Sequence, residues 1–236
     1  MELGLIAGFW VGGSTILGSL LTFFRPSFPG ADKLSSMDFA LGMMLSAAAF
    51  SLLLPAAQTS WTQGLAPFFG TIMLALFGAG VMYGLSQLMQ QKSGALLFVV
   101  AMMLHNFPEG LAAGAAFKGL TSASSLGLVG AIMLQNIPEG FMTVLAFRSL
   151  GLDARYARVG AIASGLIEVL GGGIGGAFVH HAENALPFIL AVAGGAMLQV
   201  TIRELLERVK LAPPKLPERL FSGMAFMIAV GLLGSI

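Results

Sequence analysis

Long apolar stretches separated by short polar breaks run through the whole chain. A transmembrane helix needs about 20 predominantly apolar residues, and the pattern predicts eight such helices. They cover residues 2–24, 38–58, 66–89, 95–116, 123–147, 155–180, 186–205 and 218–236. Pro108 and Pro138 fall inside the fourth and fifth stretches, whereas the other prolines, Pro55 among them, lie near the ends of stretches. We therefore predict an all-α, polytopic membrane protein whose residues 1–236 form one transmembrane domain.

Composition supports this prediction and excludes several classes of protein. The chain is 56% hydrophobic and 10% charged, against about 25% charged residues in a soluble domain, so a lipid bilayer is its expected surroundings. A net charge of +1 with no basic face argues against a nucleic-acid partner. The absence of cysteine excludes disulfides and thiolate metal sites. The N-terminal "MELGLIAGFW" lacks a basic region and a cleavage site, so we expect a retained helix, not a signal peptide.

The lysines and arginines predict an orientation in the membrane. All but Lys118 of the 12 lie in or beside the connections after helices one, three, five and seven. Positive residues accumulate on the cytoplasmic side. Eight helices in the inner (plasma) membrane with both termini outside the cytoplasm satisfy this asymmetry, and seven or nine would scatter the charges.

Three acidic residues interrupt the apolar stretches well inside the predicted spans: Glu109, Glu139 and Glu168. A charge at the centre of a membrane helix costs roughly 2.5–3.5 kcal/mol, so three would cost about 8–10 kcal/mol without compensation. No lysine or arginine lies at their depth. A cation from outside the chain, or protons, must neutralise them.

The spacing of neighbouring polar residues favours a metal ion. "HNFPEG" at 105–110 is followed by "QNIPEG" at 135–140. In each motif the first residue and the glutamate are four positions apart, so they share a helix face: His105 with Glu109, and Gln135 with Glu139. Each proline also leaves a backbone carbonyl, that of Leu104 or Leu134, without its helical donor. Because a short loop joins the two helices, the two ligand sets can face each other, and imidazole, amide and carboxylate ligands suit zinc or another divalent first-row ion.

These motifs resemble those of the Zrt/Irt-like proteins (ZIP), bacterial branch. The resemblance rests on the paired motifs, on "GMMLSAAAFSLLLP" in helix two, on "ASGLIE" in helix six and on "AGGAML" in helix seven. It implies a ZIP-like bundle that moves divalent metal ions, most often Zn²⁺ with Cd²⁺, iron or manganese as alternatives, toward the cytoplasm. It also suggests elevator-like movement of a helix group containing helices four and five, and it is compatible with a homodimer.

The resemblance further implies a two-metal site. One position would use Met44, His105, Glu109, Gln135 and Glu139. The other would use Asn106, Glu109, Asn136, Glu139 and Glu168, so that Glu109 and Glu139 bridge the two ions.

Other interpretations of single residues stay open from the sequence. Met44 also suits simple packing, and Glu168 also suits a role in holding helices together. Glu204 follows Arg203 where relatives often have a histidine, and Arg203 or Arg208 can pair with it. His180 and His181 suit a solvated loop better than a capture site.

Two other functions compete with metal transport. An intramembrane zinc enzyme, such as a protease, commonly carries H-E-x-x-H, which is absent from the chain. We therefore do not expect an enzyme. A proton-coupled solute carrier would use the same glutamates as titrating groups.

Overall fold

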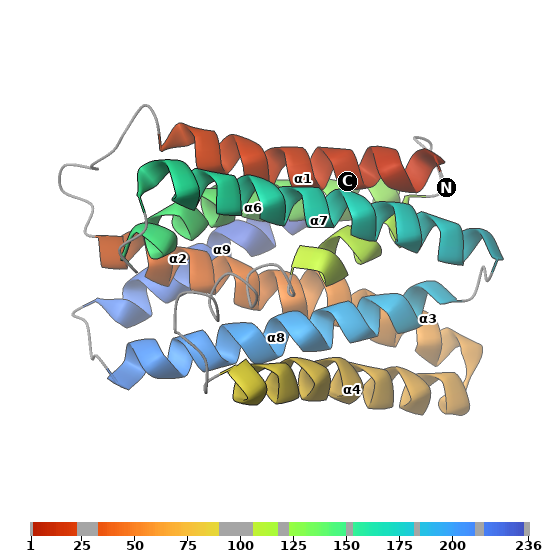
Figure 1. Cartoon of the computed structure of the whole chain (residues 1–236). Helices are drawn as coiled ribbons and strands as arrows, with labels where there is room; N and C mark the ends of the chain where they lie inside the picture. The colour runs from red at the N-terminus through yellow and green to blue at the C-terminus, as the bar shows by residue number, and fades with distance from the viewer. Residues whose placement is uncertain are drawn as a thin grey trace.

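The computed structural model describes residues 2–22, 33–89, 106–117, 123–149, 153–181, 185–210 and 215–233 (Figure 1). Within these ranges the chain forms eight helical rods and no strand. The rods are α1 (Glu2–Leu21); α2 (Lys33–Ser46), continued by the π-helical turn η1 (Ala47–Leu53) and by α3 (Leu54–Gln63); α4 (Leu65–Met89); residues 106–116; α6 (Ala123–Ser149); α7 (Ala154–His181); α8 (Leu186–Lys210); and α9 (Leu216–Leu233). The predicted all-α architecture with eight rods is confirmed.

Several rods have the length and the surface of membrane-spanning helices. Within the described ranges, five stretches are long and apolar enough to cross a membrane: Glu2–Leu21, Leu41–Gln63, Leu65–Leu88, Ala154–Phe178 and Leu186–Lys210. Large apolar side chains such as Phe69, Met73 and Phe77 of α4 are exposed on the outside of the bundle. An apolar exterior of this extent suits lipid, so the chain is a multi-pass membrane protein.

The second rod corrects the prediction for Pro55. The predicted span ended at residue 58, with this proline near its end, but the helix continues to Gln63 and Pro55 lies inside it. Proline cannot donate a helical hydrogen bond. Just before it, the N–H of Leu54 bonds to the carbonyl of Ala49, five residues back, in the wider π-helical pattern. The wider turn lets the helix pass the proline.

The remaining boundaries agree with the predicted ones to within a few residues, with three exceptions. The second rod begins at Lys33, five residues before the predicted residue 38. The predicted span 186–205 extends to Lys210 in α8, because Arg208 turns inward and is buried. The fourth span, 95–116, is described only from residue 106, so its first part, with Leu104 and His105, lies outside the described residues.

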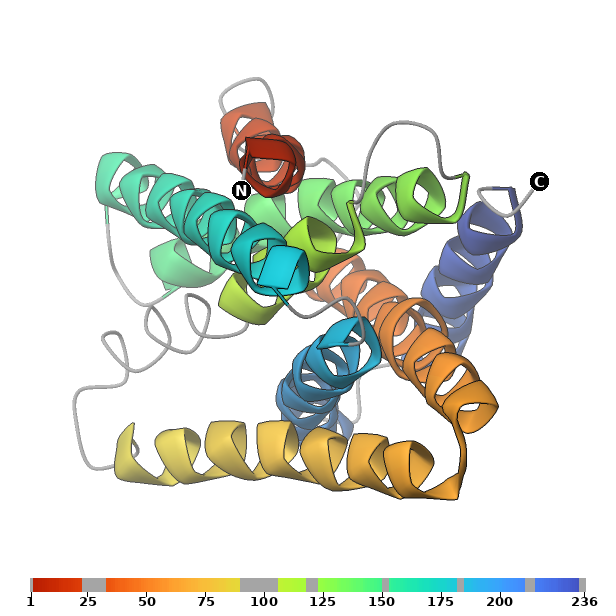
Figure 2. The ribbon, with the colours of Figure 1, turned by 90° about the vertical axis from the view of Figure 1, so that its right-hand side faces the viewer.

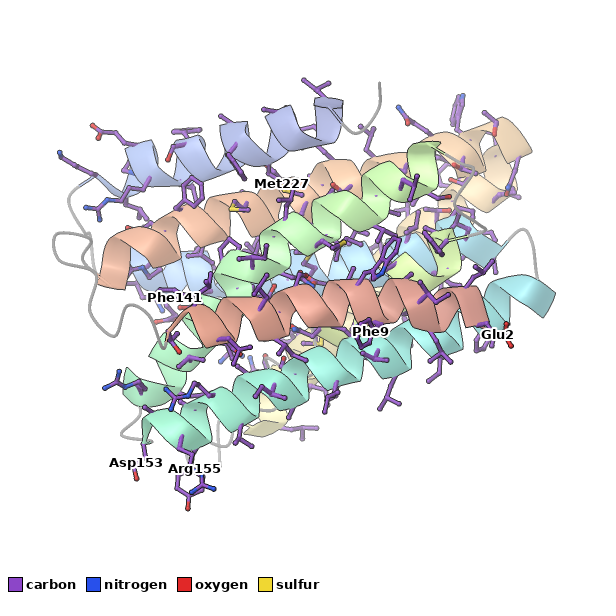
Figure 3. All side chains as sticks on the ribbon, turned by 90° about the horizontal axis from the view of Figure 1, so that it is seen from above. Glu2, Phe9, Phe141, Asp153, Arg155 and Met227 are labelled. Carbon is purple, nitrogen blue, oxygen red and sulfur yellow. The ribbon has the colours of Figure 1, made fainter. Side chains whose placement is uncertain are left out.

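The rods alternate in direction, which brings the basic residues to one end of the bundle. The ends of α1, α6 and α8 and the starts of α2, α7 and α9 lie together on the left of Figure 1. Asp153 and Arg155 project at this end, and Glu2 lies at the other (Figure 3). We call the first end the basic end; Arg148, Arg158, Lys210, Lys215 and Arg219 also belong to its helix ends.

Two groups of rods are distinguished by where their backbones touch. In the first, which we call the site group, α1, residues 106–116 and α6 pack against one side of α7, which lies at the edge of the bundle (Figure 2). Its crossings depend on glycine: a Cβ on Gly12 would meet the carbonyl of Gly165, and one on Gly110 would meet the backbone of Glu168. Side chains at these positions would force the helices apart.

The second group, which we call the frame group, contains the α2–η1–α3 rod, α4, α8 and α9. α4 packs on α8 through Gly78 and Gly195, and α2 packs on α9 through Gly42 and Gly223. None of the close glycine contacts of the described residues joins the two groups. α6 meets α2, η1 and α9 instead, through an apolar cluster that includes Ile132.

A buried ion pair holds the frame group together at the basic end. Asp38 of α2 is fully buried, and Arg208 of α8 is 3% exposed. The Arg208 guanidinium donates to Asp38 Oδ1 from Nε at 2.9 Å and from Nη2 at 2.5 Å. Arg219 of α9 reaches Asp38 Oδ2 at 3.4 Å. Asp38 therefore ties three rods together, and Arg208, considered from the sequence as a partner of Glu204, is its closest partner.

A first prediction compares two adjacent glycines of α1. Gly12→Ala should destabilise the protein by about 1–3 kcal/mol, because the added methyl group meets the backbone of α7, which cannot rotate away. Gly13→Ala is the matched control, since a Cβ there meets nothing. Thermal unfolding in detergent measures both variants, and equal melting temperatures would show that the α1–α7 contact is looser than described.

A second prediction concerns the buried ion pair. Arg208→Ala should cost about 3–5 kcal/mol, since it leaves Asp38 buried with only the more distant Arg219. Lys210→Ala is the control: its ion pair with Glu207 is exposed and contributes little. Urea unfolding compares the two variants; a small loss for Arg208→Ala would mean that Arg219 replaces it.

Candidate metal site

The three intramembrane acids lie inside the site group, each on a different helix. Glu109 belongs to residues 106–116, Glu139 to α6 and Glu168 to α7. Their exposures are 0%, 3% and 0%, so none of them faces lipid. α6 continues as a helix through Pro138, and this keeps Gln135 and Asn136 one turn before Glu139.

Glu168 is the point at which four helices meet. Its Oε1 accepts hydrogen bonds from Thr15 Oγ1 of α1 at 2.6 Å and from Asn106 Nδ2 at 2.7 Å. Its Oε2 accepts from Asn136 Nδ2 of α6 at 2.5 Å. A carboxylate offers about four acceptor positions, so Glu168 holds the site group together and keeps one position open.

The same hydrogen bonds fix the direction of two amide oxygens. Asn106 and Asn136 each donate an N–H to Glu168, and the Oδ1 atom of each is buried without a hydrogen-bond partner. Gln135 repeats the arrangement on the first acid: its Nε2 donates to Glu109 Oε1 at 3.2 Å, while Gln135 Oε1 and Glu109 Oε2 are buried without partners. Unsatisfied buried oxygens are costly, and a cation is the simplest group that satisfies several at once.

The side chains available to bind a metal ion here include amides as well as acids. Among the described residues, no three histidine, cysteine, aspartate or glutamate side chains are grouped closely enough to hold a metal ion. Amide oxygens are hard ligands that suit divalent cations together with carboxylates. Any ion held here by the described residues would therefore depend on Asn106, Gln135 and Asn136 as well as on the acids.

The other predicted ligands are placed less directly. Met44 of α2 is half-buried and packs against the main apolar cluster. His105 lies outside the described residues, as do the side chains of His180 and His181. Arg208 and Arg219 pair with Asp38, and Lys210 pairs with Glu207, so these three basic residues are paired away from Glu109 and Glu168.

Sequence reasoning missed Thr15, whose hydroxyl binds Glu168. The signal was present in helix one, where Thr15, Ser19 and Thr22 recur at helical spacing in an otherwise apolar stretch. Hydroxyls in membrane helices commonly bond back to their own backbone, as those of Ser19 and Thr22 do here. Only the packing of α1 on α7 distinguishes Thr15 from them.

Comparison with known proteins agrees with the resemblance of the motifs. The model of the family described as ZIP Zinc transporter matches residues 82–236. The chain is 32% identical over 226 residues to the zinc transporter GufA of Myxococcus xanthus, covering 87% of this chain and 88% of that protein. It is 34% identical over 221 residues to the zinc transporter ZIPB of Bordetella bronchiseptica, covering 86% and 71%. With two thirds of its length matched by the family model, and bacterial relatives aligned along most of it, the chain belongs to the ZIP family of metal transporters.

Proposed function

We propose that this protein carries Zn²⁺ across the inner membrane toward the cytoplasm, with the basic end on the cytoplasmic side. The observation that carries the proposal is the set of buried, partnerless oxygen atoms of Asn106, Glu109, Gln135 and Asn136 beside three buried acids. We choose zinc as the transported ion because both relatives are named zinc transporters. Cd²⁺, iron and manganese are the alternative cargo.

We assign two ion positions to this set of residues. The first takes Met44, His105, Glu109, Gln135 and Glu139; the second takes Asn106, Glu109, Asn136, Glu139 and Glu168. Two dications a few Å apart repel each other, and carboxylates that bridge them screen that repulsion. The hydrogen bond from Gln135 to Glu109 supports the first position, and the bonds from Asn106 and Asn136 to Glu168 support the second.

Movement of the site group against the frame group would carry the ions across. Backbone contacts through glycine tie each group internally, whereas α6 meets the frame group through apolar side chains. Apolar side-chain contacts have no fixed partner atoms, so they can exchange during sliding. The whole domain, residues 1–236, would act as one transporter unit.

The third prediction tests transport itself. In proteoliposomes, Glu109→Ala and Glu139→Ala should each reduce zinc uptake at least tenfold, because each removes a carboxylate shared by both positions. Glu207→Ala is the control, since Glu207 is an exposed acid at the basic end. Uptake by the Glu109 and Glu139 variants at the wild-type rate would remove the proposed function.

The fourth prediction tests the two positions separately. Calorimetric titration of the wild-type protein with zinc should give two ions per chain. Glu168→Ala should lose the second ion and keep the first, whereas Met44→Ala should weaken only the first. A single ion in the wild type, or loss of both in Glu168→Ala, would contradict the assignment of ligands.

A further inference from the structure

Ser164 of α7 differs from the other buried hydroxyl residues of the described chain. It is fully buried, and its Oγ has no hydrogen-bond partner. Every other buried serine or threonine in the described ranges donates a hydrogen bond, most of them to a carbonyl of their own helix. Such a bond back to the helix is available at almost any helical position. The buried hydroxyl oxygen of Ser164 therefore lacks a hydrogen bond, which lowers the stability of the folded protein.

The position of Ser164 is fixed by its neighbours along α7. Glu168 lies four residues further on, one turn away on the same face. Ala157 and Ala161, on the same face in the other direction, pack against Val144 and Phe147 of α6. The face that carries Ser164 therefore looks toward α6 on both sides of this residue.

The matching level of α6 holds a second hydroxyl. The two helices run in opposite directions, with Asn136 bonded to Glu168 and Phe147 against Gly160. Thr143 lies between the two α6 residues, as Ser164 lies between the two α7 residues. Thr143 is buried and donates to the carbonyl of Glu139 at 2.9 Å, which leaves its lone pairs free to accept.

Both hydroxyls lie on the side of the acids that faces the basic end. α7 begins at that end, so Ser164 precedes Glu168, and α6 finishes there, so Thr143 follows Glu139. We propose that Ser164 supplies a further oxygen ligand for the transported dication, one helical turn beyond Glu168 on the way to the basic end. The inference rests on the proposed function and adds a step to it: an ion that leaves the carboxylates meets the Ser164 hydroxyl, supported by Thr143, before it reaches the cytoplasmic end.

A neutral hydroxyl suits this place. A dication held only by carboxylates leaves slowly, and a weak oxygen ligand next to them lowers the cost of departure without binding the ion firmly. Ser164→Ala should therefore lower the kcat of zinc transport about three- to tenfold, the loss expected when the departing ion is deprived of one contact of hydrogen-bond strength. Ser46→Ala is the control, because Ser46 is equally buried but faces α9, donating to the Met224 carbonyl at 3.3 Å.

The closing experiment uses the absence of cysteine from the natural chain. Ser164→Cys and Ser46→Cys each introduce a single thiol, and both purified proteins are titrated with Cd²⁺, which bonds strongly to thiolate. The ultraviolet charge-transfer band of a cadmium–thiolate bond should appear in Ser164→Cys and be absent from Ser46→Cys and from the wild type. A merely structural serine would not produce this difference.

Two results would overturn the inference while leaving the proposed function in place. One is that the wild type binds Cd²⁺ while Ser164→Cys shows no band. The other is that the bands of the two cysteine variants are equal. Failure of the proposed function is recognised separately, because a wild-type protein that binds and transports neither zinc nor cadmium would fail before any cysteine variant is compared.

Discussion

The burial of three carboxylates among apolar helices is the constraint on which the rest of the structure depends. Each would cost several kcal/mol alone, and no basic side chain of the described residues is paired with Glu109 or Glu168. The chain compensates Glu168 with three donors from three other helices and Glu109 with an amide of α6. Because these donors come from different elements, compensation of charge and assembly of the site group are one event.

Close packing follows from the same requirement. Hydrogen bonds at 2.5–2.7 Å to one carboxylate from three elements need helix backbones that nearly touch, and only glycine permits this. Gly165, Gly171 and Gly172 therefore surround Glu168 in the sequence, and they meet α1 and residues 106–116 backbone to backbone. The glycines of α7 thus contribute to the site by letting the helices approach each other, although glycine has no side chain that could bind an ion.

The number of helices could be predicted from the sequence, but the hydrogen-bond and ion-pair partners between distant helices could not. Apolar periods and basic loops predicted eight rods, because lipid allows few other arrangements. The spacing of Asn106, Glu109, Asn136 and Glu139 predicted two facing ligand sets, and the structure brings these helices together through Gln135 and Glu168. The partners Thr15 of Glu168 and Arg208 of Asp38 were out of reach, since each pairing joins residues more than 150 positions apart and depends on which helices become neighbours.

The amide side chains beside the acids also bear on how a metal site of this kind could release its ions. If acids alone formed it, departure of the ions would leave bare carboxylates in a medium that cannot solvate them, and the ions would stay. Asparagine and glutamine carry both a donor and an acceptor: the N–H groups hold Glu109 and Glu168 while the oxygens remain available to a cation. Under the proposed function, the amides would stabilise the empty state through their N–H groups and the loaded state through their oxygens. A transporter must be able to reach both states. Because the same amides stabilise each of them, the free-energy difference between the empty and the loaded state would be smaller.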